Sequence, residues 1–127
     1  MSHTDRVLRE LRISEESDLL SKVACDVLRI LTILGGSAWE SELSDRLLEL
    51  WSQDHPQHGD PGRLQAKTEE ALKILGDKGI ITSKRMTKAD LSTQSQREEM
   101  LHSARNYSSL VSLFGSDKQV LKYRGQT

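Results

Sequence analysis

Seven polar side chains form two groups of the residue types that contact phosphates and base edges in nucleic acids. They are Arg63, Gln65, Lys67 and Thr68 in the first group, and Lys84, Arg85 and Lys88 in the second. Guanidinium and ammonium groups pair with phosphates, whereas Arg, Gln and Thr also hydrogen-bond to base edges. Phosphate contacts add affinity that is independent of base sequence and sensitive to salt.

Two acidic residues directly after the first group oppose this chemistry. Glu69 and Glu70 repel phosphate unless one of them accepts a hydrogen bond from a cytosine amino group. Adjacent residues on a helix point about 100° apart, which is a poor geometry for two carboxylates acting on one substrate. No glycine-rich phosphate loop follows an expected strand. We therefore expect no enzyme activity.

Candidate metal ligands are sparse. His55 and His58 are flanked by Asp54 and Asp60, but there is no cysteine cluster to complete the four ligands typical of zinc. We expect a solvated loop there, with no metal, cofactor or small-molecule ligand. Cys25 falls along an apolar stretch and is expected in the core, and a single cysteine excludes an internal disulfide.

Length and composition favour one small domain. The chain has 127 residues, of which 35% are hydrophobic, 29% charged and only 4% aromatic, so aliphatic side chains must fill the core. The longest nearly apolar run, 27–34, is too short to cross a bilayer, and residues 1–12 lack the pattern of a signal segment. We expect a single domain over 1–127 in the cytoplasm, without membrane contact.

The net charge of −1 conceals two unlike halves. Residues 1–60 carry 6 Lys and Arg against 12 Asp and Glu, whereas residues 61–127 carry 12 against 7. Such a distribution creates a basic face on a nearly neutral protein if the cations gather in space. The alternative is ordinary surface charge.

Hydrophobic spacing and helix caps predict mostly helices. Ser14 is the expected cap of a central helix that ends at Gly35, and Ser37 or Ser41 caps the next one, leaving room for a short extended stretch at 37–40. The expected helices are 4–11, 15–34, 41–53, 63–79 and 88–114, the loop is 54–62, and the strands are 80–86 and 120–124.

The segment Ala71–Ile81, with the sequence ALKILGDKGII, resembles the end of the recognition helix and the first wing strand of winged helix-turn-helix domains. The resemblance covers about residues 19–86 plus 119–124, and 15–86 plus 119–124 form the expected core. It implies a mainly α fold with a small β-ribbon. Two departures are the link 54–62, which is longer than the usual tight turn, and an additional long helix, 88–114, inserted between the wing strands.

That resemblance implies a transcriptional regulator that binds double-stranded DNA. Arg63, Gln65, Lys67 and Thr68 would enter the major groove at the start of the recognition helix. On the wing, Lys84, Arg85 and Lys88 would contact the sugar-phosphate backbone.

The late helix carries a heptad pattern. Its residues are spaced 4, 3, 4 and 3 apart and are Met100, Ala104, Tyr107, Val111 and Phe114. This seam predicts a homodimer, which would place two recognition helices in successive major grooves. The alternative is that the helix folds back on its own domain.

A second functional hypothesis is a winged-helix module that binds another protein without binding DNA. Acidic residues of two helices would then face a basic partner. They are Glu40, Glu42, Asp45, Glu49, Glu69 and Glu70.

Overall fold

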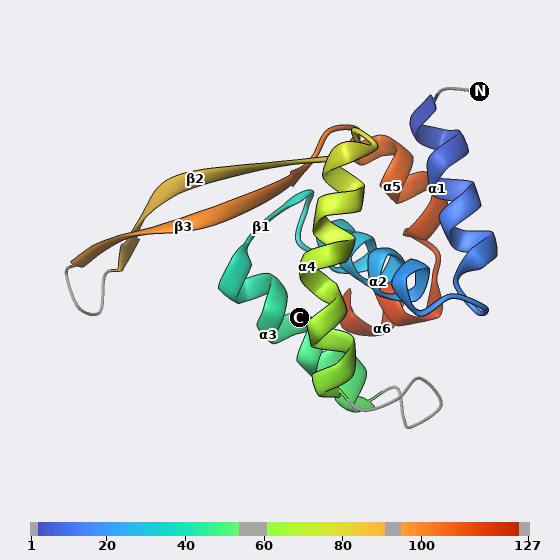
Figure 1. Ribbon diagram of the computed structural model, residues 1–127, viewed down its shortest axis with the longest axis horizontal. Coiled ribbons are helices and arrows are strands. Elements are labelled where there is room, and N and C mark those ends of the chain that lie inside the picture. Colours follow the sequence, from blue (N-terminus) through green and yellow to red (C-terminus); the bar gives the residue numbers. More distant parts are fainter. Residues whose placement is uncertain (1–2, 54–60, 91–94, 125–127) are drawn as a thin grey trace.

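The computed structural model describes residues 3–53, 61–90 and 95–124, and is mainly helical with a small three-stranded antiparallel sheet (Figure 1). Helices pack around α2, while two long strands extend as a hairpin to one side. The elements are α1 His3–Ser14, α2 Leu19–Ile33, β1 Ser37–Trp39, α3 Glu40–Gln53, α4 Pro61–Asp77, β2 Ile81–Asp90, β3 Ser95–Ala104, α5 Tyr107–Phe114 and α6 Lys118–Arg124.

Helix α2 lies at the centre of the molecule, and every residue from Ser21 to Thr32 is buried. The side chain of Asp18 caps the helix by accepting a hydrogen bond from the Ser21 N–H at 3.2 Å. The expectation that Ser14 is the cap is therefore wrong, because α1 continues through that residue. The glycine stop is confirmed: Gly35 and Gly36 adopt φ of 84° and 107°, the left-handed region that favours glycine.

Three helices cover α2 with the aliphatic stripes that the sequence contains. Their buried apolar residues are Val7 and Leu8 of α1, Leu43, Leu47, Leu50 and Trp51 of α3, and Leu64, Ala71 and Leu75 of α4. The short extended stretch before α3 is confirmed as β1. Of the expected loop 54–62, residues 54–60 lie outside the described residues. Helix α4 begins at Pro61.

The sheet has the strand order β1-β3-β2, so β3 is paired on both sides. Its long partner is β2, in a register that runs from Ile81↔Ala104 to Asp90↔Ser95. On the other side, β1 pairs only with the inner end of β3, where Trp39 lies opposite Leu101. The outer part of the hairpin consequently has two strands, and Figure 1 shows it extending well beyond the helices.

The expected helix 88–114 is wrong. Its first half forms the end of β2 and all of β3, and only Tyr107–Phe114 is helical. The heptad spacing spans the junction between a strand and a helix. Asn106 marks that junction, because its side chain caps α5 by accepting from the Ser109 N–H at 3.4 Å. Strand pairing with β2, the preceding arm of the hairpin, and with β1, which is distant in sequence, overrides the local helical pattern in β3.

The expected strand 120–124 is also wrong, since α6 spans these residues. The partner of β2 is β3, so no second wing strand is needed from the C-terminal segment. The Leu121 N–H donates to the carbonyl of Asp117 at 2.9 Å, and Val120 is fully buried. Both α5 and α6 return to pack against α2.

Candidate nucleic-acid interface

The start of α4 presents part of the expected DNA-contacting set to solvent. Arg63 and Gln65 are exposed, and Lys67 is half-buried with its Nζ 3.6 Å from Oε2 of Glu70. Arg63 and Lys67 lie on one side of the helix because they are four residues apart, whereas Gln65 points away from both. Glu69 and Glu70 are exposed on the same helix.

Thr68 does not belong to this surface, which corrects the sequence-based expectation. It is only 8% exposed, and its hydroxyl donates to the carbonyl of Leu64 at 3.3 Å. Leu64, Thr68, Ala71 and Leu75 recur at spacings of three and four, so Thr68 falls on the apolar face of α4. Its buried hydroxyl cannot reach a base edge.

The hairpin separates the three expected wing cations onto two faces. Side chains alternate between faces along a strand, so Lys84 and Lys88 share one face and Arg85 lies on the other. Lys84 and Arg85 are exposed. Arg85 forms an ion pair with Glu98 at 3.7 Å between two exposed side chains, and such pairs contribute little to stability.

Arg97 joins Lys84 and Lys88, although no pattern in the sequence indicates it. It lies directly opposite Lys88 in the hairpin register, and directly paired residues share a face. We call Lys84, Lys88 and Arg97 the cationic face. The position of Arg97 beside Lys88 follows from the pairing of β3 with β2. The helix predicted over 88–114 implies no such pairing.

Glu99 connects the cationic face to the helices. Its Oε2 atom lies 3.6 Å from both Lys88 Nζ and Arg97 Nη2, and its Oε1 accepts a hydrogen bond from the Ser41 N–H at 2.6 Å. The hydrogen bond from Ser41 holds the pKa of Glu99 below its usual value, with support from the two cations. Lys88 also lies over the ring of Trp39, 5.6 Å from its centroid.

A buried histidine joins the inner end of the hairpin to α3. His102 is 3% exposed, and its Nδ1 lies 2.7 Å from the hydroxyl oxygen of Ser83, its partner across the strands. Its Nε2 lies 3.7 Å from Oε1 of Glu40. Burial lowers the pKa of His102, and Glu40 partly offsets this effect. The imidazole is therefore neutral at pH 7.

The residues of the expected dimer seam do not form one surface. Met100 and Ala104 belong to β3, and the other three to α5. The Tyr107 hydroxyl donates to the carbonyl of Thr32 at 3.0 Å, and Phe114 is fully buried. Val111 alone of the five is exposed, at 38%. Tyr107 and Phe114 thus follow the alternative reading, in which this segment folds back on its own domain.

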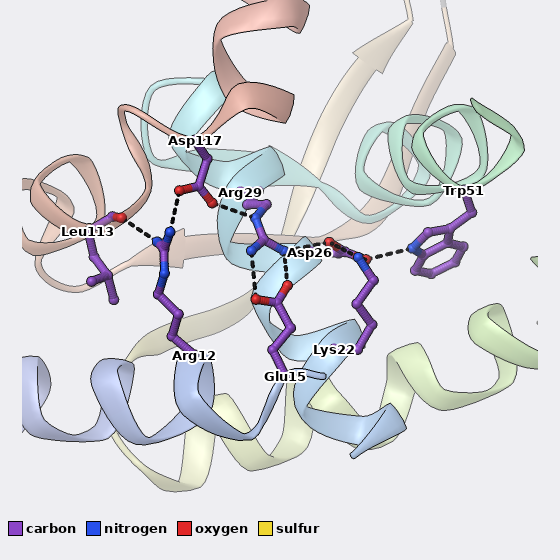
Figure 2. Close-up of polar contacts among 8 residues, drawn as sticks. All are labelled: Arg12, Glu15, Lys22, Asp26, Arg29, Trp51, Leu113 and Asp117. Carbon is purple, nitrogen blue, oxygen red and sulfur yellow. Dashed lines mark hydrogen bonds and ion pairs between the residues drawn. The ribbon is translucent and has the colours of Figure 1, made fainter. Parts of the chain in front are cut away.

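The second concentration of charge is buried between the helices (Figure 2). We call it the buried charge network, and its ionic members are Arg12, Glu15, Lys22, Asp26, Arg29 and Asp117. Arg29 lies at its centre: it pairs with Glu15, and it reaches Asp26 and Asp117, each at 2.8 Å. Arg12 and Arg29 both lie over the ring of Phe114, 5.4 Å from its centroid.

The buried charge network is a structural feature rather than a reactive site. Its three cations face three carboxylates, and Asp26 Oδ2, which lies 3.2 Å from Lys22 Nζ, also accepts a hydrogen bond from Trp51 Nε1 at 2.9 Å. The network therefore joins α1, α2, α3 and the segment before α6 through satisfied partners. Cys25 is buried nearby in α2, and burial raises the pKa of its thiol to about 12, so the expected core role is confirmed.

The described residues match neither the pattern of a metal site nor that of a membrane-spanning helix. Residues 3–53, 61–90 and 95–124 contain no group of three or more His, Cys, Asp or Glu side chains arranged to hold a metal ion. The pair His55 and His58 lies outside the described residues. None of the described helices has the length and apolar character needed to cross a membrane.

Comparisons of the chain with protein families, with curated proteins and with solved structures found no match.

Proposed function

We propose that this chain is a winged helix-turn-helix domain that binds double-stranded DNA and acts as a transcriptional regulator. In this proposal α4 is the recognition helix and the β2–β3 hairpin is the wing. The order of α2, β1, α3, α4, β2 and β3 is the order of elements in such domains. The long helix expected inside the wing is absent, which brings the arrangement closer to that family.

The observation that carries the proposal is the cationic face of the projecting hairpin. Lys84, Lys88 and Arg97 lie on one side of the hairpin, which leaves the helical body beside α4 and has two strands in its outer part. Phosphates space negative charge regularly along a duplex, so cations repeated along a strand match a DNA backbone. Arg85, on the other face, adds a contact if the hairpin enters a groove.

Helix α4 supplies the second part of the proposed contact. Arg63 and Gln65 are of types that hydrogen-bond to base edges, and both are exposed near its start. Glu69 and Glu70 restrict how closely the rest of α4 approaches phosphates. We therefore assign the general affinity to the hairpin and the base contacts to Arg63 and Gln65, which face different sides at the start of α4.

The test is direct binding of a labelled duplex of about 20 base pairs, followed by fluorescence anisotropy over a salt titration. With three or four phosphate contacts, the logarithm of the binding constant should fall against the logarithm of salt with a slope of about −3 to −4. A wild-type protein that retains no duplex at low salt contradicts the proposal.

A homodimer is compatible with the proposal, but the heptad seam no longer supports it. Light scattering of the free and DNA-bound protein would measure the mass against 14.3 kDa for one chain. If the mass corresponds to one protein chain in both states, the homodimer is excluded, and the proposal of DNA binding is not contradicted.

The exposed acids of α4 favour a protein-binding module as the second candidate. Glu69, Glu70 and Asp77 are all exposed, and a basic protein surface would complement them. A stoichiometric protein partner whose binding is lost in the charge-reversal variant Glu69→Lys, together with no duplex retention, would favour this candidate.

A further inference from the structure

A groove separates the last turns of α4 from the start of β2. Its volume is about 560 Å³, and it is bordered by Lys73, Gly76 and Asp77 of α4, by Lys84 of β2, and by Arg105 after β3. We call it the joint groove. It is distinct from the cationic face, with which it shares only Lys84.

The turn between α4 and β2 brings these elements together. Gly79 has φ of 75°, a conformation that favours glycine, and it directs β2 away from the end of the helix. The Ile80 N–H then donates to the Leu75 carbonyl at 2.9 Å, and the Arg105 N–H donates to the Ile80 carbonyl at 3.0 Å. Arg105 Nη1 would lie 3.8 Å from a Cβ atom at Gly79, so the guanidinium rests against this turn.

The cations of the joint groove outnumber its carboxylates. Within the part of the chain that the structure describes, the side chains of Lys73, Lys84 and Arg105 form no ion pair. The basic side chains of the hairpin that lie outside the groove do form ion pairs. The paired ones are Arg85 with Glu98, and Lys88 and Arg97 with Glu99. Asp77 is the carboxylate among the residues that border the groove. Three positive charges against one negative charge favour an anionic ligand.

The shape of the groove suits a ligand larger than a single ion. Gly76 lies along it, and apart from its chain neighbours and the backbone of its own helix no atom comes within 4 Å of the position where a Cβ would stand. Leu72, which is half-buried, supplies apolar surface beside the cations. A volume of about 560 Å³ falls within the range of small-ligand sites and accommodates a phosphate together with the sugar or base attached to it.

We propose that the joint groove binds a phosphate group, with Lys73, Lys84 and Arg105 as its cationic contacts. Guanidinium and ammonium groups form charge-assisted hydrogen bonds to phosphate oxygens. The phosphate comes either from a free nucleoside monophosphate or from the backbone of a bound duplex. Only the second source rests on the function proposed above.

The first experiment titrates the ¹⁵N-labelled protein with inorganic phosphate and with AMP at constant ionic strength, with chloride as the reference anion. Saturable shifts should appear at the amides of Gly76, Lys84 and Arg105. Lys84→Met and Arg105→Met should each weaken binding about tenfold or more, because each removes a charge-assisted hydrogen bond. Asp77→Asn should strengthen it, because it removes the opposing charge.

Matched variants separate the groove from general electrostatics. Lys78→Met removes one charge from the same end of α4, but Lys78 borders a different cavity, against α1 and α2, so phosphate binding should not change. Gly76→Leu should block the groove without changing any charge. Equal shifts with phosphate and chloride, or binding that survives both Gly76→Leu and Arg105→Met, would overturn the proposal.

A competition experiment distinguishes the two sources of the phosphate. If AMP displaces a labelled duplex, and Arg105→Met loses both AMP binding and duplex binding, the phosphate belongs to the DNA backbone. AMP that binds together with the duplex, or in a protein that retains no duplex, identifies a free ligand. Either result supports the phosphate site, and the second leaves it standing when the DNA proposal fails.

Discussion

Arg29 Nε donates a hydrogen bond to Asp117 Oδ2 at 2.8 Å, joining residues that are 88 positions apart in the sequence. This contact connects the central helix to the segment that leads into α6. Because Arg29 is also bound to Glu15 and Asp26, one guanidinium holds three carboxylates from three parts of the chain. Removing it would take the ion pair from Glu15 and leave Asp26 with Lys22 and Asp117 with Arg12 as their remaining cations.

We therefore expect Arg29→Met to lower the free energy of unfolding by about 3–5 kcal/mol, as when one partner of a buried ion pair is lost. Arg12→Met should cost less, because the Arg12 side chain is 37% exposed and is bound to only one of the carboxylates. Urea unfolding followed by circular dichroism measures both. A loss for Arg29→Met no larger than that for Arg12→Met would contradict the central role of Arg29.

Two glycines near the end of α4 should respond to alanine with opposite signs. Gly76 is helical and has open space at its Cβ position, so Gly76→Ala should raise stability by up to about 1 kcal/mol. Gly79 has φ of 75°, so Gly79→Ala should lower stability by about 1–2 kcal/mol. Thermal or urea unfolding of the two variants checks the signs. Equal effects would show that the turn does not need its left-handed residue.

The hairpin should become less stable in mild acid because of His102. Burial lowers its pKa from the ordinary 6.5, so the unfolded chain binds the proton more readily than the folded protein does. The free energy of unfolding should therefore fall as the pH decreases below about 6.5 and level off below the folded pKa. In His102→Gln this part of the pH dependence should disappear. Unfolding curves at several pH values, for both proteins, measure the difference.

Glu99 should contribute in a separate, more acidic window. Its folded pKa is lowered from the ordinary 4.5 chiefly by the hydrogen bond from Ser41, so its stabilising effect is present above 4.5 and is lost as the pH falls through the folded pKa. Glu99→Gln keeps an oxygen for the Ser41 N–H but loses the charge that attracts Lys88 and Arg97. That variant should show a smaller loss of stability below pH 4.5 than the wild type. An unchanged acid profile would contradict this assignment.

Charge reversal on the hairpin tests the proposed duplex binding. Lys84→Glu with Arg85→Glu should weaken all duplexes alike and reduce the salt slope by about 1, because the Lys84 contact is lost, or by about 2 if the hairpin enters a groove and Arg85 also contacts a phosphate. The matched control is Arg6→Glu with Arg9→Glu on α1, which makes the same charge change at exposed positions on the opposite side of the body from the hairpin (Figure 1). Equal weakening in both double variants would mean that only net charge matters.

The sequence predicted the helical part of the fold well, because local signals determine it. The stripes of α2 and α3, the glycine stop at Gly35 and the extended stretch at β1 follow from spacing and backbone preference. The mainly helical composition with a small sheet is confirmed. Thr68 shows a missed local signal: its four-residue spacing from Leu64 already placed it on the apolar face.

The remainder of the fold depended on strand pairing, which the helix-like spacing of the sequence does not indicate. Strand β3 carries a helix-like spacing at Met100 and Ala104, and only pairing with β1 and β2 makes it a strand. The pairing of β3 with β2 places Arg97 opposite Lys88, and it brings Arg105, which follows β3, to the start of β2. No local pattern indicates which cation will lie beside which, so these residues could not be chosen from the sequence.

The sheet order also separates the length of the hairpin from the integrity of the body. The chain leaves the helices at Ile81 and returns at Ala104, and these two residues lie opposite each other. Each outer pair, such as Thr87 with Glu98, can be deleted together without shifting the register of the pairs inside it. The distance to which the hairpin extends can thus change independently of the helices. Shortened versions should keep their helical packing and contact a smaller area of a binding partner.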